Sequence, residues 1–262
     1  MKYILILLAF HLAGCNSNER ASEPPANTLS QEKLLIKDQQ KYPDSILILE
    51  NLVQFYRENG EYGKSFSTVN DALKKDSGSY RLWHIKGVLH YENEDTLQAI
   101  KALEKSTRLS TNLNDVLLLA KLYAETKNPL ALQLAGLVIK QGEFIKESIL
   151  IKGLYHSGIG EDEKAITYFD EAINISYSFM EPYKEKALVL YRQQNYMEAL
   201  RLLDKAVKIK SSYAEGYYYM GRCFEKLNRL DDAKESYETA LIYDSNYEEA
   251  TQALTTVSAL IN

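Results

Sequence analysis

The sequence predicts an all-α protein: a right-handed α-solenoid of stacked helical hairpins with a capping helix at each end. Two observations lead to this prediction. Small and large apolar residues recur with a period of 33 or 34 residues between positions 46 and 247, and within each period they follow the spacing of two successive helices. The composition agrees, because 5 prolines and 12 glycines in 262 residues leave little room for the many turns of a β-sandwich.

Residues 1–14 have the features of a signal peptide. A positive charge at Lys2 precedes an apolar run from Ile4 to Ala13, which is too short to span a bilayer as a mature helix. The run Leu12-Ala13-Gly14-Cys15 resembles a bacterial lipobox, and this resemblance implies that the thiol of Cys15 receives a diacylglycerol before cleavage. The alternative interpretations are an ordinary secretory signal with a chance cysteine, or an apolar N-terminal helix.

Residues 15–29 are predicted to form a flexible tether, because they are polar, contain Pro24-Pro25 and carry almost no apolar face. In proteobacterial lipoproteins, an aspartate after the lipidated cysteine retains the protein in the inner membrane. Asn16 stands there in this chain, so the resemblance implies the outer membrane. Some bacteria export lipoproteins that carry an acidic cluster just after the cysteine, but at that place only Glu19 is acidic here, which favours the periplasmic face over the cell surface. The expected localisation is the bacterial cell envelope, lipid-anchored in the outer membrane and facing the periplasm.

Two predicted capping helices flank the periodic region. Residues 30–45 carry Leu34, Leu35 and Ile36 in a helical run that closes near Pro43, which cannot continue a helix interior. Residues 248–262 form a second amphipathic segment. The end units of a repeat array need a covering element, because each unit buries its apolar faces only against a neighbour.

Six repeats are predicted between these caps: 46–79, 80–112, 113–145, 146–179, 180–213 and 214–247. The last is the most regular. Gly221 and Ala233 are small residues where its two helices approach, and Tyr217, Phe224 and Tyr237 fill the space around them. In the third repeat, the loop at residues 127–129 is one residue short. This pattern resembles the tetratricopeptide repeat (TPR), over residues 46–247, and the resemblance implies a solenoid fold while saying little about function.

The sequence shows no constellation typical of an enzyme, so the chain is expected to be non-catalytic and without a cofactor or a metal. His84 and His90 are six residues apart on one helix, roughly 240° around its axis, and cannot share a metal ion. The only other cysteine, Cys15, is expected to carry the lipid, so Cys223 has no partner for a disulfide and is expected to be a buried small hydrophobe. The net charge of −5 and the absence of a basic block argue against nucleic-acid binding. No small-molecule substrate is evident.

The candidate binding residues lie on the first helix of each repeat. In stacked TPR units the second, fifth, ninth and twelfth positions line the concave surface, and their steps of 3, 4 and 3 residues form one stripe. On this stripe the candidates are Arg81, His84 and Tyr91 in the second repeat, Lys184 and Tyr191 in the fifth, and Tyr218 and Arg222 in the sixth. Arginine and aromatic residues are good anchors for a peptide, although they can equally be ordinary surface residues. The ninth-position asparagine with which chaperone-binding TPR domains hold a carboxylate is missing.

The expected function is therefore that of a scaffold or adaptor that binds a protein or peptide partner in its concave groove. Thirteen of the 20 tyrosines lie at or after Tyr155, which favours repeats five and six as the site, with an extended acidic or aromatic segment as the ligand and Arg222 paired with a carboxylate. Two alternatives stay open. The narrower one is an assembly factor, resembling pilotins or outer-membrane-protein assembly lipoproteins. The less favoured one is an enzyme of cell-wall turnover.

Overall fold

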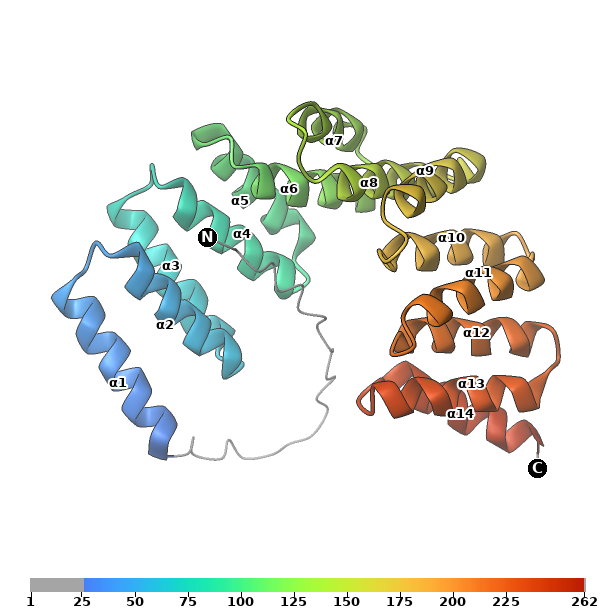
Figure 1. Cartoon of the computed structure of the whole chain (residues 1–262). Helices are drawn as coiled ribbons and strands as arrows, with labels where there is room; N and C mark the ends of the chain where they lie inside the picture. Colours follow the sequence, from blue (N-terminus) through green and yellow to red (C-terminus); the bar gives the residue numbers. More distant parts are fainter. Residues whose placement is uncertain (1–25, 262) are drawn as a thin grey trace. The chain divides into compact units, whose positions relative to one another are not determined.

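Every regular element of the computed structural model, which describes residues 26–261, is an α-helix (Figure 1). The prediction of an all-α protein is confirmed. The helices of this range are α1 (Ala26–Lys41), α2 (Ile46–Glu58), α3 (Tyr62–Lys75), α4 (Tyr80–Glu92), α5 (Thr96–Leu109), α6 (Leu113–Glu125), α7 (Leu130–Lys140), α8 (Ile145–Gly158), α9 (Asp162–Ile175), α10 (Glu181–Arg192), α11 (Tyr196–Ile209), α12 (Ala214–Lys226), α13 (Leu230–Tyr243) and α14 (Glu248–Ile261).

Consecutive helices form hairpins that repeat the same turn. Each first helix is followed by a left-handed residue at the fifteenth position of its repeat: Gly60, Glu94, Lys127, Gly160, Gln194 and Asn228. A left-handed residue lets the chain reverse while the last carbonyl groups of the helix still find backbone donors. In the third repeat, Lys127 is followed four residues later by the buried Ala131, whereas Asn228 is followed five residues later by Ala233, so the short loop lies where the sequence predicts it.

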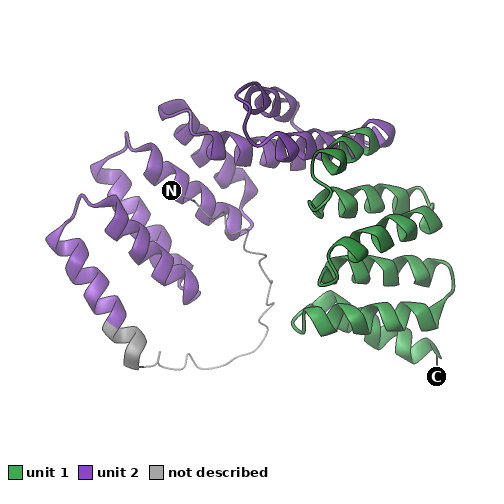
Figure 2. Ribbon diagram, viewed as in Figure 1, with its two compact units in different colours: residues 1–20, 166–262 green, residues 21–165 purple. Residues whose placement is uncertain are grey.

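The described chain divides into two compact units, with the boundary inside α9 between Ala165 and Ile166 (Figure 2). We refer to residues 26–165 as the N-terminal unit and to residues 166–261 as the C-terminal unit. Because each hairpin packs on its sequence neighbours, each unit is a short stack with its own core.

The core of the N-terminal unit is largely aliphatic. Leu49, Val53 and Val69 from the first hairpin pack with Leu82 and Leu89 from the second. Further along the chain, alanines occupy the places where helices come closest, and Ala99, Ala120, Ala131 and Ala135 are fully buried. Helix α1 covers the first hairpin, where Leu35 and Ile36 pack on a buried cluster of Leu52, Phe55 and Tyr56. This helix begins at Ala26 and ends at Lys41, ahead of Pro43.

The core of the C-terminal unit relies more on tyrosine. Tyr183 and Tyr237 are among its largest fully buried side chains. Gly221 on α12 faces the ring of Tyr237 on α13, because a Cβ atom built on this glycine would lie 2.7 Å from Cδ1 of Tyr237 and still closer to Cε1. The glycine therefore makes room for the ring. Helix α14 closes the unit: its own Ala250 and Val257 are fully buried in a cluster with Tyr237 and Ala240 of α13.

Candidate functional site

The predicted binding residues lie on the first helices of their hairpins, as expected, but each contacts a side chain of an adjacent repeat or of its own helix. The first helices concerned are α2, α4 and α6 in the N-terminal unit and α10 and α12 in the C-terminal unit. These contacts determine how much of each side chain is available to bind a partner protein.

Arg81 on α4 pairs with the preceding repeat. One of its terminal nitrogens donates to both carboxylate oxygens of Glu50 on α2, at 2.8 and 3.0 Å. Both side chains are partly exposed, so this pair contributes at most about 1 kcal/mol to stability.

His84 on α4 is oriented by a buried acid of the next repeat. Its Nδ1 lies 2.6 Å from Oδ1 of Asp115 on α6, and Asp115 is 1% exposed. The other oxygen of Asp115 accepts a short hydrogen bond from the hydroxyl of Ser106, which itself is fully buried. The Nδ1 edge of the imidazole ring therefore faces this carboxylate, and Nε2 lies on the opposite edge of the ring.

Between α2 and α4 the N-terminal unit has a hollow of about 290 Å³. Val53, Ile85 and Val88 give it an apolar lining, and His84 and Arg57 are polar residues beside them. Arg57 forms a short ion pair with Glu92 of the next repeat. Burial raises the pKa of the Glu92 carboxyl, although the guanidinium of Arg57 opposes this shift.

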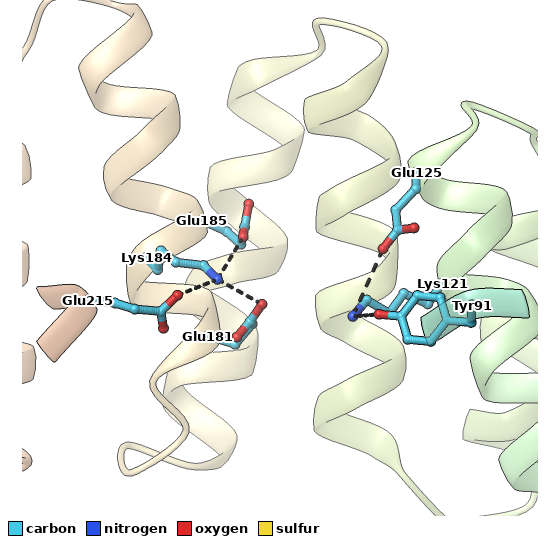
Figure 3. Close-up of polar contacts among 7 residues, drawn as sticks. All are labelled: Tyr91, Lys121, Glu125, Glu181, Lys184, Glu185 and Glu215. Atoms are coloured by element: carbon cyan, nitrogen blue, oxygen red, sulfur yellow. Dashed lines mark hydrogen bonds and ion pairs between the residues drawn. The ribbon is translucent and has the colours of Figure 1, made fainter. Parts of the chain in front are cut away.

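Tyr91 on α4 accepts a hydrogen bond of 3.1 Å from Nζ of Lys121 on α6, whose ammonium also lies 5.6 Å from the centre of the tyrosine ring (Figure 3). The carboxylate of Glu125, one turn further along α6, lies 3.9 Å from the same nitrogen. Burial raises the pKa of Glu125, while Lys121 opposes the rise.

Lys184 in the C-terminal unit is surrounded by carboxylates. Its Nζ lies 3.1 Å from Glu181 and 3.7 Å from Glu185, both on α10, and 3.5 Å from Glu215 on α12 (Figure 3). The lysine side chain is 15% exposed. Burial alone lowers the pKa of this ammonium, but Glu181, Glu215 and Glu185 together outweigh burial and raise the pKa above its ordinary value. The position therefore carries more negative charge than positive.

Arg222 on α12 lies between two tyrosines. Its guanidinium carbon is 5.8 Å from the ring centre of Tyr191 on α10 and 5.9 Å from that of Tyr218 on α12, and its Nη1 donates to the hydroxyl of Tyr218 at 3.0 Å. Tyr218 is 8% exposed and packs against Tyr219, Tyr237 and Tyr247. It acts mainly as part of the core, whereas Arg222 and Tyr191 are half-buried.

Sequence reasoning did not single out the three glutamates around Lys184. A signal for them exists, because Glu181 and Glu185 flank the lysine on its own helix and Glu215 follows it by 31 residues. Arg81 follows Glu50 by the same 31 residues, which joins the fifth position of one repeat to the second position of the next. Ion pairs between the fifth position of one repeat and the second position of the next are thus readable from an offset of 31 residues.

Two further titratable residues, His156 and Cys223, are buried. His156 is buried near the end of α8. Its Nδ1 lies 2.6 Å from the carboxylate of Glu161, which follows in the turn after this helix. Cys223 is buried and unbridged, and burial raises the pKa of its thiol to about 12. Over the part of the chain that the structure describes, no group of three or more potential metal ligands occurs, and no helix has the length and hydropathy needed to cross a bilayer. Cys15, the predicted lipidation site, lies outside the described residues.

Comparison with known proteins identifies the repeats. Two family models described as tetratricopeptide repeat match residues 80–113 and residues 184–251. Among curated proteins, the STIP1 homolog of Dictyostelium discoideum is 34% identical over 93 residues, which are 33% of this chain and 16% of that protein. Stress-induced-phosphoprotein 1 of Caenorhabditis elegans is 21% identical over 223 residues, which are 83% of this chain and 62% of that protein. The chain thus spans less than two thirds of the length of both relatives.

Solved structures share the fold. A tetratricopeptide repeat protein from Parabacteroides merdae aligns with a TM-score of 0.74 at 16% identity, covering 88% of this chain and 93% of its own. PilW, a type IV pilus biogenesis factor, aligns with a TM-score of 0.62 at 16% identity, covering 80% of this chain and 96% of its own. The chain therefore contains tetratricopeptide repeats and has the α-solenoid fold that the sequence predicts.

Proposed function

We propose that this chain is a non-catalytic scaffold of the bacterial envelope, anchored by a lipid on Cys15 to the outer membrane and exposed to the periplasm, and that it binds a protein partner through the first helices of its C-terminal unit. Tetratricopeptide repeats provide a protein-binding framework, and the repeats with their capping helices account for residues 26–261. The anchor and the localisation are supported by the sequence of residues 1–19.

One observation supports the choice of surface. A half-buried arginine on α12, Arg222, holds its guanidinium against the ring of Tyr191 on α10, and the same two helices carry the charged group around Lys184. We name these residues the α10–α12 face: Glu181, Lys184, Glu185, Tyr191, Glu215, Tyr219 and Arg222. Arginine and tyrosine residues that are already partly shielded from water are those whose truncation most often weakens a protein interface.

The binding surface can be tested by crosslinking in intact cells followed by purification and mass spectrometry. Replacing both Tyr191 and Arg222 with alanine should abolish capture of the proteins that crosslink to the unaltered chain. The matched variant Arg81→Ala with Tyr91→Ala, which removes an arginine and a tyrosine from first helix α4, should leave capture intact. If the α4 variant loses capture and the other keeps it, the binding surface lies in the N-terminal unit instead.

The anchor has its own test. Cys15→Ala should block both acylation and signal cleavage, because the thiol that carries the lipid is gone. The protein should then accumulate as an uncleaved precursor, which intact-mass measurement distinguishes from the acylated mature form. A mature species that begins elsewhere and carries no acyl mass would disprove the lipid anchor.

The narrower hypothesis is an assembly factor for an envelope machine. Deleting the gene should then reduce the multimers of a pilus secretin, or the folded amount of outer-membrane β-barrel proteins, and restoring the Cys15→Ala form should not repair the defect. Normal levels of both in the deletion strain would reject this hypothesis while leaving the scaffold function untouched. The enzyme alternative predicts digestion of purified peptidoglycan by the chain.

A further inference from the structure

We infer that the α10–α12 face recognises a basic segment of the partner protein, with lysine or arginine side chains bound at Glu215. This inference rests on the proposed function and reverses the acidic ligand that the sequence favours. Three observations support it: an excess of carboxylates, tyrosine rings beside them, and a buried hydroxyl without a partner.

The first observation is the charge around Lys184. Three carboxylates surround one ammonium at 3.1 to 3.7 Å, so the group as a whole is negative. Lys184 contacts a single oxygen of Glu181 and of Glu215, and both glutamates are substantially exposed. A carboxylate offers about four acceptor directions, so each of these two can accept a further donor. Lys184 itself shows that this set of side chains holds an ammonium group.

The second observation is the aromatic surrounding of Glu215. The half-buried Tyr219 and Tyr247 both pack on Tyr218, each with ring centres 5.0 Å from its ring. Tyr219 lies one turn after Glu215 on α12. Burial raises the pKa of Tyr219 and of Tyr247, and Glu215 adds to the rise in both, while Lys184 opposes it in Tyr219. A cation near a tyrosine ring gains attraction from the negative face of the ring, in addition to its pairing with a carboxylate.

The third observation is the hydroxyl of Tyr213, at the start of α12. Tyr213 is 6% exposed, and among the described residues its hydroxyl is buried without a hydrogen-bond partner. Tyr213 directly precedes α12, two residues before Glu215, and burial together with Glu215, Glu181 and Glu185 raises the pKa of this hydroxyl. An unpaired buried hydroxyl costs free energy, and a polar group that reached it would relieve that cost.

An acidic segment fits this face poorly. Its carboxylates would meet those of Glu181, Glu185 and Glu215, and Lys184 is already shared among them. Arg222 is engaged with the hydroxyl of Tyr218 and lies against two tyrosine rings. Like charges brought together at an interface oppose binding, so the face discriminates by sign of charge.

The test uses the purified full chain and two fluorescently labelled peptides of equal length. One is rich in lysine and arginine, and in the other every basic residue is replaced by glutamate. Fluorescence anisotropy should give at least about tenfold tighter binding of the basic peptide at low salt, with the preference shrinking when salt shortens the range of the charges.

Two variants locate the effect. Glu215→Gln keeps the shape of the side chain and should weaken basic-peptide binding about two- to tenfold. Glu235→Gln, at an exposed glutamate on α13, changes the net charge equally and should have little effect. Equal effects of the two variants, tighter binding of the acidic peptide, or binding of neither peptide would each overturn the inference.

These experiments distinguish a wrong charge preference from a wrong binding surface. If the variant lacking Tyr191 and Arg222 loses capture in cells but the acidic peptide binds more tightly, the α10–α12 face binds a partner and only its charge preference is wrong. If the basic peptide binds and depends on Glu215 while capture in cells does not depend on Tyr191 and Arg222, the proposed surface for the cellular partner is wrong.

Discussion

Two equivalent positions in the two units carry opposite charges. In the N-terminal unit, Glu50 at the fifth position of the first repeat pairs with Arg81 at the second position of the next. In the C-terminal unit, Lys184 at the fifth position pairs with Glu215 at the second. The fold fixes where the two side chains meet, and the sequence decides which of them is the cation. The Lys184 pair is further enclosed by Glu181 and Glu185, which makes it the more acidic of the two.

A second pair of equivalent positions places a cation over a tyrosine ring in each unit. Lys121 lies over the ring of Tyr91, and Arg222 over the ring of Tyr191, in both cases from the ninth position of one repeat to the twelfth of the preceding repeat. Lys121 donates to the hydroxyl of the tyrosine beneath it, whereas Arg222 donates to Tyr218 on its own helix. The planar guanidinium can face two rings and donate along its edge, which an ammonium cannot do.

The largest expected effect comes from displacing α12, because this helix carries both Glu215 and Arg222. Gly221→Leu forces a side chain against the buried ring of Tyr237, and overpacking of this kind lowers the free energy of unfolding by about 1–3 kcal/mol. Denaturant unfolding measures the loss. The matched change Gly136→Leu on α7 places a Cβ atom where nothing lies within 4 Å, so it should leave stability unchanged or raise it by up to about 1 kcal/mol.

Hydrogen exchange then shows which helices lose amide protection in the Gly221→Leu variant. Because repeats are stabilised by their nearest neighbours, protection should fall first in α11 to α14. The N-terminal unit, with its own core, should keep its protection. Uniform loss from α2 to α14 would show that the chain unfolds as a single globule and would contradict the division into repeats.

The next effect concerns the two lysines of Figure 3. Lys184→Met leaves three carboxylates without their shared cation. Removing one partner of a fully buried pair costs about 3–5 kcal/mol, and because these glutamates are partly exposed we expect about 1–2 kcal/mol. Lys121→Met should cost less than about 1 kcal/mol, since Lys121 is 38% exposed. Urea unfolding of both variants at the same salt concentration gives the loss in free energy of unfolding for each. Equal losses would show that the ion pairs of Lys184 contribute no more to stability than those of Lys121.

The smallest effect concerns a hydrogen bond from a tyrosine to a glutamate that occurs in similar form in both units. The hydroxyl of Tyr123 donates to Glu104 at 2.7 Å in the N-terminal unit, and that of Tyr237 donates to Glu225 at 2.9 Å in the C-terminal unit. Burial, with Glu104, raises the pKa of Tyr123 to about 12. In the unfolded chain the pKa of tyrosine is about 10, so between these values the unfolded state has lost a proton that the folded state keeps. The free energy of unfolding therefore falls as the pH rises through this window.

Tyr123→Phe should remove this contribution and flatten the pH dependence by about 1 kcal/mol between pH 10 and pH 11. Chemical unfolding at a series of alkaline pH values measures the slope. Tyr177→Phe, at a tyrosine that is 70% exposed, is the matched control and should leave the slope as it is. An unchanged slope in Tyr123→Phe would mean that this hydroxyl is not protected in the folded state.

Much of the fold could be predicted because it depends on local periodicity. The small residues Gly221 and Ala233 and the large Tyr237 were readable as packing positions from their spacing alone. Side-chain roles on the first helices were harder to predict. Tyr218 occupies a stripe position, yet its contacts with Tyr237 and Tyr247 bury it, and those contacts depend on α13 and on the turn before α14. The charge at Lys184 could be read only together with Glu215 in the next repeat, which requires the register between repeats.

The opposite charges of the two fifth-position pairs restrict which repeats can be neighbours at these two junctions. A helical hairpin carrying Lys184 placed directly before one carrying Arg81 would bring two cations to the same junction, and one carrying Glu50 placed before Glu215 would bring two anions. Like charges held at such a short separation repel. The first and fifth repeats are therefore not interchangeable: exchanging their hairpins would place like charges at both of these junctions, so such a rearranged array should assemble less stably than the natural order.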